Sequence, residues 1–404
     1  MINFKYKFKQ IFFFLTNIEN KSYIFSRFAS VSIKPLILFI CIFFNFEEFG
    51  ALIAMIFLVS SVNITFASIP IFRNFYLNID NKSPQKKKHS KDKYKSEIII
   101  LFFISLIFLI PLNGFFKNNI EILVSTVLVF SIDKIYDEIQ RFLIIKKNFY
   151  EWSILTNYKN ITLLIFFLNP LMNINVIFLG VIYFIINFSK YFKYINIFFK
   201  LNFKKEIKRF FFSLKKNKKI FILNYLLVFY TVGDKIVVGK LFNENLAEYL
   251  LLGNILSIPL LFINFFYISK YRTEFVKNII TFNDVIFSKK FNYLLISTFF
   301  LTIIMVAIYY FTKLSGLSIK TFIFLFLIYI INVYNLILDE IIYWKSFYKD
   351  FLFFECLFIF FFLSIFFLTA YNSLNLEIFL IMILCIYFLK ILFKYIIFIK
   401  KMKI

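Results

Sequence analysis

Seven ionisable side chains lie in otherwise apolar stretches of the chain and are the first candidates for chemistry. The cations are Arg27, Lys34, Lys134 and Lys235, and the carboxylates are Asp133, Asp137 and Asp234. Arg27 and Lys34 are seven residues apart and therefore share one face of a helix. A charge in the middle of an apolar helix that spans a membrane costs at least about 2.5–3.5 kcal/mol, so it normally faces a polar cleft or a partner.

The two signs of charge predict two kinds of chemistry. Lysine and arginine in a low-dielectric cleft can replace the water around a phosphate or pyrophosphate group, with arginine forking onto its oxygens. The aspartates could carry a proton or a cation that resets an empty carrier. A structural reading competes with this one, because Asp133, Asp137 and Arg141 are spaced four residues apart and could form an ion-pair ladder worth little net energy.

The composition indicates which class of fold holds these charges. Of 404 residues, 61% are hydrophobic and 23% aromatic, the mean hydropathy is +0.81 and the formal net charge is +25. A soluble domain is about 45–50% apolar and has too little interior for so much Phe and Ile. We therefore expect an all-α integral membrane protein, and we exclude a soluble enzyme, a disulfide scaffold and a nucleic-acid-binding protein.

Twelve apolar runs are long enough for helices that cross a bilayer, which takes roughly 20 residues per crossing. They cover about 23–45, 49–72, 96–116, 120–145, 152–169, 171–189, 219–241, 245–270, 290–312, 319–338, 346–369 and 373–399. Membrane β-strands alternate apolar and polar residues, whereas these runs are continuous. The prediction is a multi-pass protein of about 12 transmembrane helices.

Lysine and arginine are distributed unevenly over the predicted loops. The two termini and every second loop hold 37 of the 47 Lys and Arg residues, and the alternate loops hold only four. The positive-inside rule then places both termini in the cytoplasm. The remaining six cations lie within spans and are the ones that bear on function.

The loop charges make a prediction about topology. Reporters fused at His89 and at Phe212 should both report the cytoplasmic side, whereas a reporter at Asn173 should report the opposite side of the membrane. An activity pair such as alkaline phosphatase and green fluorescent protein would check this. Reversal at any one of the three positions would contradict the twelve-span arrangement.

The basic stretch 190–219 divides the chain into two halves, 1–205 and 206–404, each with six predicted spans. Glu48-Phe49 corresponds to Glu248-Tyr249 at an offset of 200, and Asp137-Glu138-Ile139 corresponds to Asp339-Glu340-Ile341 at an offset of 202. We expect two six-helix pseudo-repeats in the same orientation. Transporters built in this way bind at the interface between the halves.

Three segments resemble motifs of a known family. They are Phe46-Glu47-Glu48-Phe49-Gly50, Asp137-Glu138-Ile139-Gln140-Arg141-Phe142, and Asp234 to Phe242 followed by Ala247-Glu248-Tyr249. In order and placement they are similar to motifs of the Wzx-type O-antigen and polysaccharide flippases. These belong to the multidrug/oligosaccharidyl-lipid/polysaccharide exporter superfamily, and the resemblance covers nearly the whole chain.

The resemblance implies a MATE-like fold in the inner membrane of a bacterium. The implied activity is alternating-access transport of an undecaprenyl-pyrophosphate-linked oligosaccharide, an O-antigen or capsule repeat unit, without a catalytic residue, a metal or a bound cofactor. A proton or a sodium ion is the implied coupling ion. Arg27 and Lys34 match the region of the family's substrate-binding cations, and Asp234 is the expected coupling position. The implied partners are the lipid-linked oligosaccharide, membrane lipids and the polysaccharide polymerase and assembly machinery.

Two alternatives stay open at the level of sequence. A polytopic polysaccharide polymerase or lipid-linked glycosyltransferase is the enzymatic alternative, but it usually needs a sizeable outer loop and the predicted outer loops are only a few residues long. A multidrug or cation exporter of the same fold is the other. An acidic, cation-poor cleft would favour the exporter, and Arg27 and Lys34 oppose it.

Overall fold

The computed structural model describes residues 33–79, 98–111, 114, 119–145, 148–195, 203–263, 288–311, 317–344 and 348–402. Arg27 and the loop around His89 lie outside these residues, as does the side chain of Arg141. Every regular element that is described is a helix. The predicted all-α class is confirmed to this extent. The count of twelve spans and the MATE-like repeat stay predictions.

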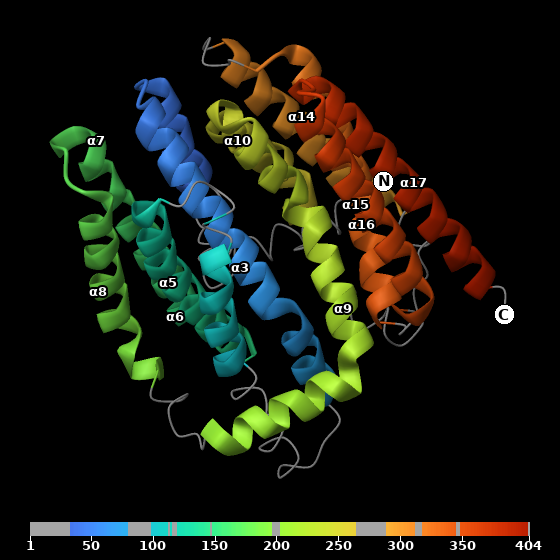
Figure 1. The fold of residues 1–404 in the computed structure, drawn as a ribbon, viewed down its shortest axis with the longest axis horizontal. Coiled ribbons are helices and arrows are strands. Elements are labelled where there is room, and N and C mark those ends of the chain that lie inside the picture. The colour runs from blue at the N-terminus through green and yellow to red at the C-terminus, as the bar shows by residue number, and fades with distance from the viewer. Residues whose placement is uncertain are drawn as a thin grey trace, which may run out of the picture. The chain divides into compact units, whose positions relative to one another are not determined.

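The chain forms two compact units, Met1–Phe212 and Ser213–Ile404. The helices of unit 1 are Ile33–Phe43, α3 (Glu47–Ile79), Ile98–Pro111, α5 (Ile120–Ile145), α6 (Phe149–Leu163), η1 (Leu164–Phe167), α7 (Leu168–Met172) and α8 (Val176–Ile195) (Figure 1). Helix α9 (Phe203–Leu241) begins in unit 1 and continues into unit 2.

Helix α5 is the central element of unit 1 and packs against α3, α6 and α8. Its side chains Val129, Phe130 and Ile132 are fully buried in this core. Gly180 of α8 allows a close approach to α5, because a Cβ atom added there would lie 3.2 Å from Cδ1 of Leu128. Neighbouring helices therefore surround the middle of α5, where its charged residues lie.

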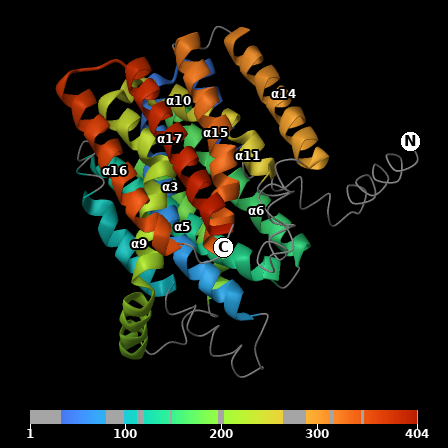
Figure 2. The ribbon, with the colours of Figure 1, turned by 90° about the vertical axis from the view of Figure 1, so that its right-hand side faces the viewer.

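Unit 2 is also built from packed helices. After α9 come η2 (Asn243–Asn245), α10 (Leu246–Leu256), α11 (Ile258–Phe262), α14 (Lys289–Phe311), α15 (Ile319–Trp344), α16 (Tyr348–Tyr371) and α17 (Leu376–Met402). Helix α17 packs against both α15 and α16, and α10 packs against α14 and α15 (Figure 2). Helix α15 therefore lies between α17 on one hand and α10 and α11 on the other.

Several helices have the length and composition of membrane-spanning segments. Among the described residues, Phe291–Tyr310, Phe351–Tyr371 and Leu376–Ile397 are long and apolar enough to cross a bilayer. Five shorter apolar helical stretches accompany them: Ile33–Phe43, Glu48–Ile64, Ile98–Pro111, Val176–Phe192 and Ile319–Asn335. This pattern is that of a membrane-associated protein.

The outward face of α16 supports the same conclusion. Phe353, Phe360 and Phe367 are exposed and recur at intervals of seven residues, which places them along one side of the helix. Soluble proteins rarely expose contiguous apolar patches of this kind. The stripe is suited to contact with lipid.

Three turns between consecutive helices use residues with a positive φ angle. Asn45 (φ 56°) precedes α3, Asn173 (φ 53°) separates α7 from α8, and Ser373 (φ 49°) separates α16 from α17. Glycine adopts this conformation most easily, but the chain has only 7 glycines, and asparagine tolerates the left-handed region better than most residues. The turns are short, as the sequence predicts for the outer loops.

Candidate functional site

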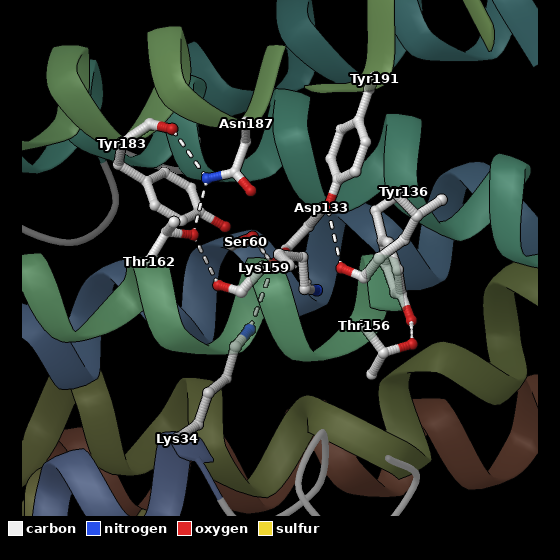
Figure 3. Close-up of polar contacts among 11 residues, drawn as sticks. Lys34, Ser60, Asp133, Tyr136, Thr156, Lys159, Thr162, Tyr183, Asn187 and Tyr191 are labelled. Carbon is white, nitrogen blue, oxygen red and sulfur yellow. Dashed lines mark hydrogen bonds and ion pairs between the residues drawn. The ribbon is translucent and has the colours of Figure 1, made fainter. Parts of the chain in front are cut away.

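Asp133, in the middle of α5, lies between two lysines from other helices. Its Oδ1 accepts a hydrogen bond from Lys159 Nζ at 2.7 Å, and its Oδ2 accepts one from Lys34 Nζ at 3.2 Å (Figure 3). Ser60 of α3 donates a weaker bond to Oδ2 at 3.5 Å. The Asp133 side chain is 3% exposed, so this contact lies inside the helical core. We call Lys34, Asp133 and Lys159 the Asp133 triad.

Aromatic rings support both ammonium groups of the Asp133 triad. Lys159 Nζ lies 4.4 Å from the centroid of the Tyr136 ring, and Lys34 Nζ lies 5.0 Å from that of Phe57. Tyr136 follows Asp133 by three residues on α5, so the ring and the carboxylate face the same side. The negative faces of the rings attract the lysines without neutralising them.

The Asp133 triad carries more positive than negative charge. One carboxylate faces two ammonium groups, which leaves a formal charge of +1 on the three side chains. A buried charge is tolerated only when paired and hydrogen-bonded, so removing any member changes the balance sharply. Such an arrangement can accept a further anion, because both lysines gain attraction from it.

The structure places the other candidates of α5 differently. Lys134 bonds to Glu138 on the same helix, with 2.5 Å between Nζ and Oε1, and both side chains are buried. Asp137 is half-buried one turn beyond Asp133. Lys134 therefore belongs to an intrahelical ion pair with Glu138, whereas Asp133 serves as the counter-ion of Lys34 and Lys159 from other helices.

Asp234 and Lys235 of unit 2 form a second polar group. The hydroxyl of Tyr249, on α10, donates to Oδ2 of Asp234 at 2.7 Å, and Lys235 Nζ lies 3.4 Å from Oδ1. Both Asp234 and Tyr249 are buried. Asp234 and Tyr249 belong to the same sequence motif and are fifteen residues apart. Their hydrogen bond links α9 to α10.

A third group lies outside the seven predicted site residues. Glu355 of α16 bonds to Lys390 and Lys394 of α17, with N–O distances of 3.0 and 3.2 Å. All three side chains are only 2–3% exposed. The sequence assigns both lysines to the basic C-terminal stretch that fixes orientation, and the structure instead buries them. We call these residues the Glu355 triad.

Three lysines outside the seven predicted site residues carry a recognisable signal in the sequence. Lys159 lies between Asn157 and Asn160 in the least apolar part of its predicted span, and Lys390 and Lys394 are four residues apart inside an apolar run. Spacing of four places two lysines on one face of a helix. The sequence does not show which neighbouring helix these lysines face.

Comparison with known proteins does not extend this picture. No protein-family model matches the chain, and neither a curated protein nor a solved structure matches it. The function has to be inferred from the arrangement of the buried charges.

Proposed function

We propose that this protein is a flippase that moves an undecaprenyl-pyrophosphate-linked oligosaccharide, an O-antigen or capsule repeat unit, across the bacterial inner membrane by alternating access. The observation that carries the proposal is the Asp133 triad, a buried carboxylate with two lysines and an excess positive charge. The apolar helices and the lipid-facing stripe of α16 support a membrane location.

The reasoning starts from the cost of moving a pyrophosphate through hydrocarbon. Its negative charges lose their water there, and a protein has to supply replacement contacts. Lys34 and Lys159 supply two ammonium groups from different helices, already held in place by Asp133. In the empty protein Asp133 neutralises part of their charge, and an arriving pyrophosphate competes with Asp133 for the same two lysines.

Unit 2 supplies the remaining parts of the proposal. The Glu355 triad repeats the arrangement of two lysines on one buried carboxylate. Asp234 is the proposed coupling carboxylate for a proton or a sodium ion. Its contact with Lys235, at 3.4 Å, is longer than the contacts of Asp133 with Lys34 and Lys159, at 3.2 and 2.7 Å. Transport of this kind requires no catalytic residue, and the proposed partners are the lipid-linked oligosaccharide and the polysaccharide assembly machinery.

The decisive experiment removes the excess charge while keeping a balanced pair. In the source bacterium with its own copy deleted, Lys159→Gln should lower surface glycan by about tenfold or more, because a charged hydrogen bond contributes about 1.5–3 kcal/mol. The variant keeps the Lys34–Asp133 pair, so the protein should remain in the membrane at normal levels. Surface glycan is measured by gel electrophoresis and antibody staining, and protein by immunoblot.

Two matched variants complete the test. Lys159→Arg keeps the charge and should retain most of the surface glycan. Lys320→Gln removes an exposed lysine at the start of α15 and should have no effect. Normal surface glycan with Lys159→Gln, at normal protein levels, would refute the role assigned to the Asp133 triad.

A further inference from the structure

Two buried polar atoms on α8 have no hydrogen-bond partner among the described residues: the hydroxyl of Tyr183 and Oδ1 of Asn187. Both side chains are 0% exposed. They are four residues apart and therefore lie on the same face of α8. Buried polar groups in folded proteins are nearly always paired, so two open ones on one helix face point to a missing partner.

The neighbouring bonds fix what kind of partner fits. Asn187 Nδ2 donates to Thr162 Oγ1 and to the carbonyl oxygen of Tyr183, both at 2.8 Å. The nitrogen of the amide is therefore occupied, and its oxygen remains as an acceptor (Figure 3). A group that donates to Asn187 and accepts from Tyr183 would satisfy both, and a single hydroxyl can do both.

These open groups lie beside the Asp133 triad. Thr162, which holds the Asn187 amide, donates its own hydroxyl to the carbonyl oxygen of Lys159 at 2.8 Å. The Asp133 carboxylate is also near enough to Tyr183 to interact with it electrostatically. Because Asp133 in turn holds the Lys159 ammonium group at 2.7 Å, a ligand that reaches this ammonium group with a phosphate would have its adjoining group on the side of Tyr183 and Asn187 (Figure 3).

We infer that Tyr183 and Asn187 bind a hydroxyl of the sugar attached to the pyrophosphate, so that unit 1 recognises the first sugar as well as the charge. This inference rests on the proposed function of the Asp133 triad. Because both residues are fully buried, α6 and α8 have to separate before a sugar can enter. The 3₁₀ segment η1, which follows α6 directly, is the kind of break in a helix that often serves as a hinge.

The test compares two lipids that differ only in their sugars. The purified full-length chain in nanodiscs is titrated with undecaprenyl pyrophosphate and with the lipid-linked oligosaccharide that accumulates in the deletion strain. We expect the sugar-bearing lipid to bind about tenfold more tightly, as two added hydrogen bonds would give. Tyr183→Phe should remove about threefold or more of this preference, and Tyr183→Phe with Asn187→Leu should abolish it. Neither change should alter the affinity for undecaprenyl pyrophosphate.

Thermal unfolding distinguishes binding of a ligand by Tyr183 from a purely structural role of this residue. The Tyr183→Phe change deletes only an unpartnered hydroxyl, so the temperature of thermal unfolding should stay the same or rise. Tyr191→Phe is the matched control, since Tyr191 is a fully buried tyrosine of the same helix whose hydroxyl donates to the carbonyl of Leu155 at 3.4 Å. It should keep the full preference for the sugar-bearing lipid.

The outcomes separate this inference from the proposed function. Equal binding of both lipids by the unaltered protein overturns the sugar site and leaves the flippase proposal standing. Binding of neither lipid overturns both. An undiminished preference in Tyr183→Phe overturns the sugar site alone, and a loss of preference at normal stability supports it.

Discussion

Replacing Asp133 by asparagine should remove most of the folded protein from the membrane. The change leaves Lys34 and Lys159, whose side chains are 27% and 12% exposed, without their shared counter-ion. Breaking a fully buried ion pair on one side costs about 3–5 kcal/mol, and the partial exposure of the lysines places the expected loss at the lower end of that range. Domains are stable by only about 5–15 kcal/mol, so a loss of this size is a large fraction of the total. The measurement is the amount of monodisperse protein after detergent extraction, together with its thermal unfolding temperature.

A triple variant should restore the folded protein that Asp133→Asn loses. Lys34→Gln, Asp133→Asn and Lys159→Gln combined leave no charge in the triad, and the amides can still form hydrogen bonds. Folded protein should return to near the normal level, while surface glycan should stay absent because the cations are gone. Ser60→Ala removes only the weak 3.5 Å bond to Asp133 and should change stability by less than about 0.5 kcal/mol. Normal amounts of folded Asp133→Asn would show that the two lysines do not need Asp133 as their counter-ion.

Glu355→Gln should have an effect of similar size in unit 2. It leaves Lys390 and Lys394 in an interior where their side chains are only 2–3% exposed, at a cost of about 3–5 kcal/mol. The contact between α16 and α17 should weaken, and the protein should unfold at a lower temperature. Thermal unfolding followed by size-exclusion chromatography measures this directly.

Two further variants are needed to interpret the result of Glu355→Gln. Lys390→Met and Lys394→Met added to Glu355→Leu replace the triad by apolar side chains of similar length, and such replacements are often neutral or stabilising. Glu377→Gln is the control, because Glu377 lies at the other end of α17, half-buried, where it accepts a hydrogen bond from Ser318. An equal decrease in the thermal unfolding temperature of Glu355→Gln and Glu377→Gln would mean that burial of the Glu355 triad does not contribute to stability.

The sequence predicted the class of the fold better than the partners of its charges. Long apolar runs specify helices in a membrane because every backbone group must be satisfied within the segment. The same runs also marked Asp133 and Asp234 as exceptional. The predicted boundary at 205 and the predicted repeats rest on sequence alone.

The Asp133 triad itself could not be predicted. Lys34 is 99 positions from Asp133, and Lys159 is 26 positions away on another helix. Periodicity tells which side of a helix a residue occupies, but not which helix faces that side. For that reason the sequence predicts Asp133 and its neighbour Lys134 as site residues, but it does not show that Lys159 is the α6 lysine that bonds to Asp133.

The short turn at Ser373 has a consequence for biosynthesis. It joins α16 to α17, two apolar helices that pack together and share the Glu355 triad. Inserted one at a time, the helices would each carry bare charges into hydrocarbon, at about 2.5–3.5 kcal/mol per charge. Entering as one hairpin, they carry an acid and two lysines that already neutralise one another in part. We expect the translocation machinery to handle these helices as a pair, with the short turn at Ser373 between them.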